Sequence, residues 1–237
     1  MTSPAPRLPR RCVWPWLAVV LLAVVALHGA LWWVATARLE QALEITVTRM
    51  RAEGWTVSHG TPHRAGWPLA AALDVPDVSL AGPVGAVPGG VAWQTPLLRG
   101  VWQPLQPRQL LLQVSGTQRL RLGPAAPVEV TADVLQAVLP LVAPGGPRQA
   151  ALTGTDVRLT GEDWTGAATI AALRVRLEEP GQVGSGPEGS GTTGTAPSRH
   201  SLYAAAEEIT LPTLPAGLRW PLGPHIATLS LDATAVG

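Results

Sequence analysis

A long uncharged segment near the N-terminus limits what this chain can fold into. Residues 12–37 contain no Asp, Glu, Lys or Arg, and the stretch from Leu17 to Leu27 is almost entirely Leu, Val and Ala. About 20 apolar residues in a helix cross a bilayer core of about 30 Å. The sequence therefore predicts a transmembrane helix over residues 12–37, which follows a cytoplasmic N-terminus over residues 1–11.

Tryptophans and arginines flank the segment in the way that is typical of a membrane anchor. The tryptophans near its two ends are Trp14, Trp16, Trp32 and Trp33. Such aromatic belts mark the two membrane interfaces. Arg7, Arg10 and Arg11 precede the segment, and the positive-inside rule keeps them in the cytoplasm. Lys, Asn and Phe are absent, a bias typical of a GC-rich bacterial genome. We therefore expect an anchor in a bacterial inner membrane and a periplasmic C-terminal domain.

A cleaved signal peptide is the alternative interpretation of the same segment. Ala35-Thr36-Ala37 has the small-residue pattern of a cleavage site. The apolar run is longer than the usual hydrophobic core of a signal peptide, and it ends in bulky tryptophans. These two features favour an uncleaved anchor.

The next segment, residues 38–53, predicts a short amphipathic helix that acts as a stalk. Leu39, Leu43, Val47 and Met50 recur at helical spacing, and charged residues occupy the other faces. Gly54 is the expected stop. We expect the apolar side of this helix to pack against the following domain rather than on the membrane.

After Gly54 the pattern changes to short alternating runs that are interrupted by Pro and Gly, which predicts an exported β-rich domain over residues 54–179. The clearest half-buried strand is 173–178, where Leu and Val alternate with Arg and Glu. Residues 110–114 and 120–122 are expected to form a hairpin across Ser115-Gly116-Thr117. Residues 128–141 change parity midway, and so indicate either a bulged strand or a short helix.

A short pattern of polar, aliphatic, polar and Leu residues recurs along the domain. Its copies begin at Asp77, Asp156, Arg174, Glu208 and Thr228. The pattern is too general for a solenoid repeat, but it suggests antiparallel strands in one long sheet with a continuous apolar face.

Residues 180–200 are rich in Gly, Ser and Pro and predict a flexible loop. Residues 201–237 predict further strands of the same sheet. Strands on either side of such a loop can still pair, because the entropy cost of closing a loop grows slowly with its length. We expect the strand after the loop to pair with the strand before it.

A set of short motifs resembles a known bacterial family. The set comprises Gly54-Trp55-Thr56-Val57, Arg64-Ala65-Gly66-Trp67-Pro68-Leu69, Val75-Pro76-Asp77-Val78 and the Trp-x-x-Pro elements at Trp93 and Trp102. In this order, behind a membrane helix and a stalk, they resemble the domain-of-unknown-function family 2125. The Gly66-Trp67-Pro68 strand start also resembles the N-terminal module of the AsmA-like envelope proteins.

The resemblance implies a strongly curved antiparallel sheet with an apolar inner face and a role in the cell envelope, with lipid handling as the leading idea. It implies no catalytic residues. In that family the stretch 226–237 leads into a further segment, so this chain is expected to be truncated or naturally short.

Few residues suggest a specific site. Trp67, Trp93 and Trp102 either seal the end of the sheet or line an apolar groove for an acyl chain. His59 and His63 are separated by Gly60 and Pro62, so neither they nor any other residues predict a metal site, and we expect no catalytic residues and no cofactor. The slightly acidic exported part argues against nucleic-acid binding. The sequence thus predicts a non-enzymatic, anchored envelope protein that binds or guides lipid, or alternatively a scaffold that binds another envelope protein through a sheet edge.

Overall fold

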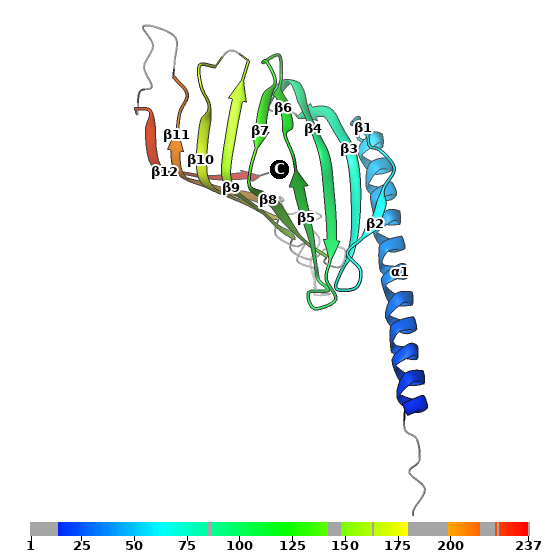
Figure 1. The fold of residues 1–237 in the computed structure, drawn as a ribbon. Coiled ribbons are helices and arrows are strands. Elements are labelled where there is room, and N and C mark those ends of the chain that lie inside the picture. The colour runs from blue at the N-terminus through cyan, green and yellow to red at the C-terminus, as the bar shows by residue number, and fades with distance from the viewer. Residues whose placement is uncertain are drawn as a thin grey trace, which may run out of the picture.

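A single helix carries the chain from the hydrophobic segment to the start of the sheet. In the computed structural model, α1 (Trp14–Ala52) runs without a break through the predicted transmembrane segment and the predicted stalk (Figure 1). Arg49 and Arg51 lie in its last turn, where the helix dipole favours cations. Gly54, with a φ of 88°, follows the helix in a conformation that glycine adopts without strain. The two predicted helices are therefore one continuous helix.

The structure describes residues 14–84, 87–141, 148–162, 164–179, 199–213, 221 and 223–236. The predicted cytoplasmic N-terminus over residues 1–11 lies outside the described residues. The predicted loop over residues 180–200 does so as well, except for residues 199 and 200, which begin a strand.

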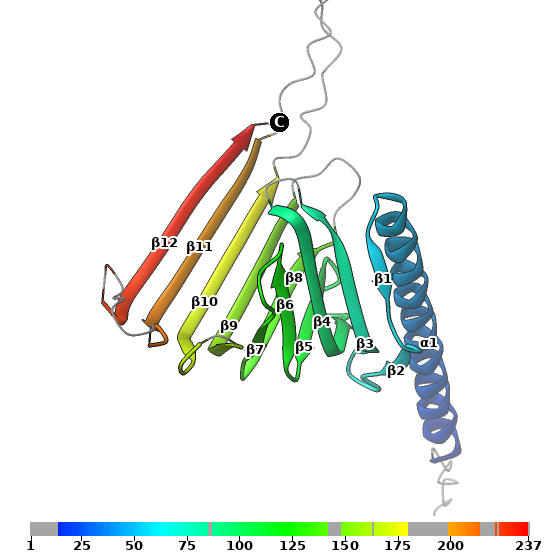
Figure 2. The ribbon, with the colours of Figure 1, turned by 90° about the horizontal axis from the view of Figure 1, so that it is seen from above.

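The described strands form one antiparallel sheet in which neighbours in space follow one another along the chain (Figure 2). The strands are β1 (Thr56–Ser58), β2 (His63–Ala65), β3 (Ala71–Val84), β4 (Val87–Trp102), β5 (Gln109–Ser115), β6 (Gln118–Leu122), β7 (Val128–Thr131), β8 (Val134–Pro140), β9 (Arg148–Gly161), β10 (Ala168–Glu179), β11 (Arg199–Thr210) and β12 (His225–Val236). The predicted mainly-β fold with one long sheet is confirmed. β10 and β11 pair along most of their length, so the expected pairing across residues 180–198 is confirmed as well.

The predicted hairpin between residues 110–114 and 120–122 is wrong. β5 and β6 do not pair with each other; both pair with β4, one beyond the other along the same strand. They are two parts of one strand, interrupted at Gly116. The Cβ of any larger residue at Gly116 would lie 2.5 Å from Cγ of Pro96 on β4. The Ser-Gly-Thr sequence therefore makes room for Pro96 and does not reverse the chain.

The ambiguous segment 128–141 is an interrupted strand and not a helix. Its two parts, β7 and β8, both pair with β9. The interruption lies at residues 132–133, where the amide of Asp133 still donates to the carbonyl of Thr155. β5–β6 and β7–β8 are thus matching interrupted strands in the middle of the sheet.

A line of backbone irregularities crosses the sheet at one level, and we call it the crease. Asp77, Asp156 and Glu208 lie on it with φ values of 51°, 49° and 51°. They are the first residues of three of the recurring sequence patterns. The interruptions at residues 116–117 and 132–133 fall on the same line, because β5–β6 and β7–β8 break where their neighbours bend. Figure 1 shows β9 to β12 changing direction sharply at this level.

The packed core is small and lies where α1 meets the first strands. Leu73, Val75 and Val78 of β3 are buried, and Leu39 and Leu43 of α1 pack against them. Val47, one turn further along the helix, is buried too. The apolar side of the predicted stalk thus packs against the β domain, as expected. α1 lies beside β1 and β3 at one edge of the sheet and leaves the strands toward β12 uncovered by helix (Figure 2).

Candidate functional site

One face of the sheet carries apolar side chains in rows, and each row crosses eight strands, from β3 to β12. Residues paired directly across an antiparallel ladder point to the same face. The row next to the crease consists of Val75, Leu98, Val114, Leu135, Gly154, Leu173, Ala206 and Leu229. The next row consists of Leu73, Gly100, Leu112, Ala137, Leu152, Val175, Ala204 and Leu231. Every member is apolar, and we call this surface the apolar face.

The opposite face is polar at the same level of the sheet. The row that lies between the two apolar rows consists of His63, Asp74, Arg99, Gln113, Gln136, Thr153, Arg174, Ala205 and Ser230. We call this surface the polar face. The period of two along each strand is thus kept in register across the whole sheet.

The strongest electrostatic interaction of the polar face joins Asp74 and Arg99. Nε and Nη2 of Arg99 donate to the two carboxylate oxygens at 2.6 and 2.7 Å. These hydrogen bonds hold the pKa of Asp74 below its usual value, although desolvation of the carboxyl group opposes the shift. Two weaker pairs, Arg119–Glu129 and Arg174–Glu207, lie on the same face. Three ion pairs thus join neighbouring strands on this face.

Two hollows lie on the polar face, with volumes of about 480 and 830 Å³. The first is at the crease, between Asp77 and the Arg119–Glu129 pair. The second is open between the long side chains of Arg174, Arg176 and Tyr203. Among the described residues, no three His, Cys, Asp or Glu side chains are grouped as metal ligands would be. The first hollow contains the Arg119–Glu129 pair and the second contains the Arg174–Glu207 pair, and hydroxyl groups line both.

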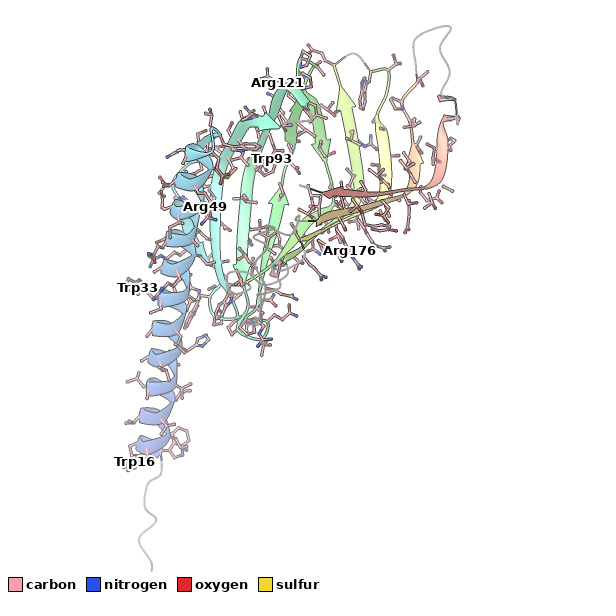
Figure 3. All side chains as sticks on the ribbon, turned by 180° about the vertical axis from the view of Figure 1, so that it is seen from behind. Trp16, Trp33, Arg49, Trp93, Arg121 and Arg176 are labelled. Carbon is pink, nitrogen blue, oxygen red and sulfur yellow. The ribbon has the colours of Figure 1, made fainter. Side chains whose placement is uncertain are left out.

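The apolar face is covered by α1 only near β3. Leu39 and Leu43 pack on Leu73 and Val75 there. At the far end of the face, Leu229 and Leu231 of β12 are exposed. Figure 3 shows Arg176 projecting from the other side, on the outside of the bend. An apolar surface that is continuous over several strands and uncovered marks a binding surface more often than a scattering of single exposed residues does.

Trp67 lies at the junction between α1 and the sheet, in the turn that joins β2 to β3. Its ring contacts that of His28 in a tilted arrangement with a centroid distance of 4.8 Å, and it meets the ring of Trp32 edge-on at 5.9 Å. The backbone of the same turn is held by two side chains of the helix. Nε2 of His28 lies 2.6 Å from the carbonyl oxygen of Pro68, and Nε1 of Trp32 donates to that of Ala70 at 3.1 Å. Residues 66–70 are thus clamped to the helix.

Trp93 and Trp102 lie at different levels of β4 and do not join Trp67 in one groove. Trp93 pairs with Leu80 and Leu120 beyond the crease and packs against the buried core. Trp102 ends the strand, pairs with Ala71 and donates its indole N–H to the carbonyl of Pro107. Trp102 thus shares the end of the sheet with Trp67, whereas Trp93 lies within the sheet, away from that end.

The tryptophans expected at the membrane interfaces occupy the helix surface. Trp14, Trp16 and Trp33 are largely exposed. In the described part of the chain, α1 is the one helix that is long and apolar enough to cross a membrane, and its most apolar part is not covered by the rest of the protein. Trp32 faces the sheet instead, through its hydrogen bond to Ala70.

Sequence reasoning missed the polar part of the clamp between α1 and β2. Nε and Nη2 of Arg64 donate to the two carboxylate oxygens of Glu40 at 2.9 and 2.7 Å, and its guanidinium lies 5.2 Å from the ring centroid of Trp33. The hydrogen bonds from Arg64 lower the pKa of Glu40 below its usual value. No sequence pattern links residues that are so far apart, and only the docking of the helix brings them together.

Comparison with known proteins identifies a family but no activity. No curated protein and no solved structure matches the chain. One family model matches residues 32–236, from the last turns of the hydrophobic segment to the end of β12. That family is described as "Uncharacterized protein conserved in bacteria (DUF2125)", and this chain belongs to it.

Proposed function

We propose that this chain is a non-enzymatic envelope protein, anchored in the bacterial inner membrane by α1, whose apolar face binds or guides the acyl chains of lipids. The observation that supports the proposal is the register of the sheet. It aligns apolar residues over eight strand positions on one face and polar residues on the other. The resemblance of the Gly66-Trp67-Pro68 strand start to AsmA-like envelope proteins points in the same direction.

The shape of the surface suits a long chain better than a compact ligand. The apolar rows run across the strands and are exposed at Leu229 and Leu231 of β12, whereas the two hollows lie on the polar face. Dispersion and area burial are non-directional, so such a surface holds an acyl chain without recognising a particular head group. We therefore expect lipids to bind according to chain length more than head-group identity.

Two adjacent residues of β5 give a matched test of this proposal. Leu112 belongs to the apolar face and Gln113 to the polar face. A photoreactive amino acid at each position, in the full-length chain in bacterial membranes, reports what each face touches. We expect a lipid adduct at position 112 and none at position 113.

Equal labelling of lipid at both positions would show that the apolar face has no preference for acyl chains, and the proposal would fall. An adduct at position 112 that contains only another protein would also contradict it. Ala137 and Gln136 on β8 repeat the comparison on a second strand.

The outer edge of β12 supports a second candidate function, that of a scaffold. Among the described residues β12 pairs with β11 alone, and the twelve-residue strand carries Asp232 as its single formal charge. Long, weakly charged edges accept additional strands. In that case, crosslinking in cells from the outer edge of β12 traps one dominant envelope protein, and a chain that crosslinks to no partner contradicts it.

A further inference from the structure

Exposed leucines gather at one end of the sheet, on strands that lie next to one another. Leu69 precedes β3 and is 86% exposed, and Leu105 follows β4 and is 94% exposed. Leu141 follows β8 and is 47% exposed. The pairing of Ala71 with Trp102, of Trp102 with Leu110 and of Leu110 with Leu139 places these ends side by side. We call residues 66–72, 101–111 and 138–141 the tip; it ends one row short of Leu112 and Ala137, which belong to the apolar face.

The tip is apolar on both faces of the sheet, unlike the level just above it. On the side of the polar face, one row consists of Ala72, Val101, Leu111 and Val138. On the side of the apolar face, the matching row consists of Ala71, Trp102, Leu110 and Leu139. A soluble sheet that is covered on one face shows apolar residues on that face only. The end of the sheet is therefore suited to an apolar environment on all sides.

Charge is nearly absent from the tip. Among its described residues the single charged one is Arg108, whose long side chain can carry its guanidinium away from an apolar layer. Further along the same row, β10, β11 and β12 carry Arg176, Tyr203 and Asp232. The level that is apolar on both faces is thus confined to the strands near α1.

The contacts with α1 fix the height of the tip along the helix. Trp67 and Pro68 contact His28, and Ala70 accepts a hydrogen bond from Trp32. His28 lies about 21 Å along the helix from Trp14, at 1.5 Å per residue. A bilayer core is about 30 Å thick, so a helix that begins its span at Trp14 is still inside the membrane at His28. The turn that His28 holds must then lie within the same leaflet.

We propose that the tip is inserted into the leaflet from which α1 emerges, with Leu69 and Leu105 among the acyl chains. Trp67 and Trp102, together with Trp33 on the helix, then lie at the level where amphipathic rings prefer the membrane interface. This inference rests on the proposed anchoring by α1, and it deepens the proposed function. It makes the bilayer that holds the anchor the source of the lipid, because the apolar rows begin directly above the inserted tip.

Depth-dependent fluorescence quenching tests the insertion on the full-length chain. In a Cys12→Ser background, Leu69→Cys and Leu105→Cys are each labelled with an environment-sensitive fluorophore. The protein is reconstituted into phosphatidylcholine–phosphatidylglycerol vesicles that contain lipids with a nitroxide on the acyl chain. We expect both positions to lose fluorescence to the nitroxide.

Two further positions make the result decisive. Ala125→Cys, in the turn between β6 and β7 at the opposite end of the sheet, is expected to keep its fluorescence. Val20→Cys, in the middle of the apolar part of α1, is expected to lose it.

Loss of fluorescence at Val20 without loss at Leu69 and Leu105 overturns the insertion and leaves the anchor in place. Retention at Val20 overturns the anchor and the insertion together. The adduct test at Leu112 reads the apolar face separately, so failure of lipid binding is distinguished from failure of insertion.

Discussion

At the scale of the residue, the Asp74–Arg99 ion pair predicts how the free energy of unfolding changes with pH. A carboxyl group whose pKa is lowered on folding stabilises the fold above its unfolded pKa, and the stabilisation is lost as the pH falls through the folded pKa. Arg99 is 43% exposed, so solvent screens the pair, and we expect Asp74→Asn to lower the free energy of unfolding by about 1 kcal/mol at pH 7. The difference from the unchanged chain should shrink below about pH 4. Urea unfolding of the full-length protein in detergent, followed by circular dichroism, measures both.

The matched control is Glu129→Gln, which breaks the more exposed Arg119–Glu129 pair. We expect it to cost less than about 0.5 kcal/mol. A loss as large as that of Asp74→Asn, or a loss at Asp74 that does not change with pH, would contradict the assignment. Neither pair could be predicted from the sequence, because the partners lie on different strands and their register was unknown.

At the scale of the element, the crease holds three residues in a left-handed backbone conformation, and two of them are Asp. Asp is among the few residues other than Gly that adopt such a φ, and a β-branched residue is strained there. We expect Asp77→Val to lower the free energy of unfolding by about 1–2 kcal/mol, and Asp77→Gly to be nearly neutral. Ser79→Val, two residues further along the same strand, is the control, since valine favours a regular strand. Equal losses at positions 77 and 79 would show that the bend imposes no backbone strain.

The strands of the sheet could be predicted from the sequence, but the positions where they bend could not. Alternating runs predicted most of the strands, and the recurring polar–aliphatic–polar–Leu pattern was visible. The pattern did not separate Asp77, Asp156 and Glu208, which bend the sheet, from Arg174 and Thr228, which begin regular stretches, because a polar residue fits both. The hairpin prediction failed for a related reason. Ser115-Gly116-Thr117 has the composition of a turn, and only the position of Pro96 on β4 shows that Gly116 relieves a steric conflict instead.

At the scale of the whole molecule, the hydrophobic segment predicted the helix, but nothing predicted how the helix docks. His28 and Pro68 are 40 residues apart. The three tryptophans expected either to seal the end of the sheet or to line a groove lie apart: Trp67 at the junction with α1, Trp93 in the middle of β4 and Trp102 at its end. The docking bears on the cleaved-signal alternative. Cleavage after Ala37 would remove His28 and Trp32, and with them the aromatic contacts of Trp67 and the two side chains that hold the turn over residues 66–70.

The orientation of the molecule in the membrane can be measured directly. The arginines before the hydrophobic segment predict that Cys12 faces the cytoplasm and that the turn at Ala125 faces the periplasm. In spheroplasts of bacteria that express the full chain, a membrane-impermeant maleimide should label Ala125→Cys in a Cys12→Ser background. It should leave the natural Cys12 unlabelled until the cells are lysed. The reverse pattern would place the sheet in the cytoplasm, and with it the tip in the cytoplasmic leaflet. Recovery of the Ala125→Cys chain in the soluble periplasmic fraction would instead show that the anchor is removed, which the contacts of His28 and Trp32 with residues 67–70 lead us not to expect.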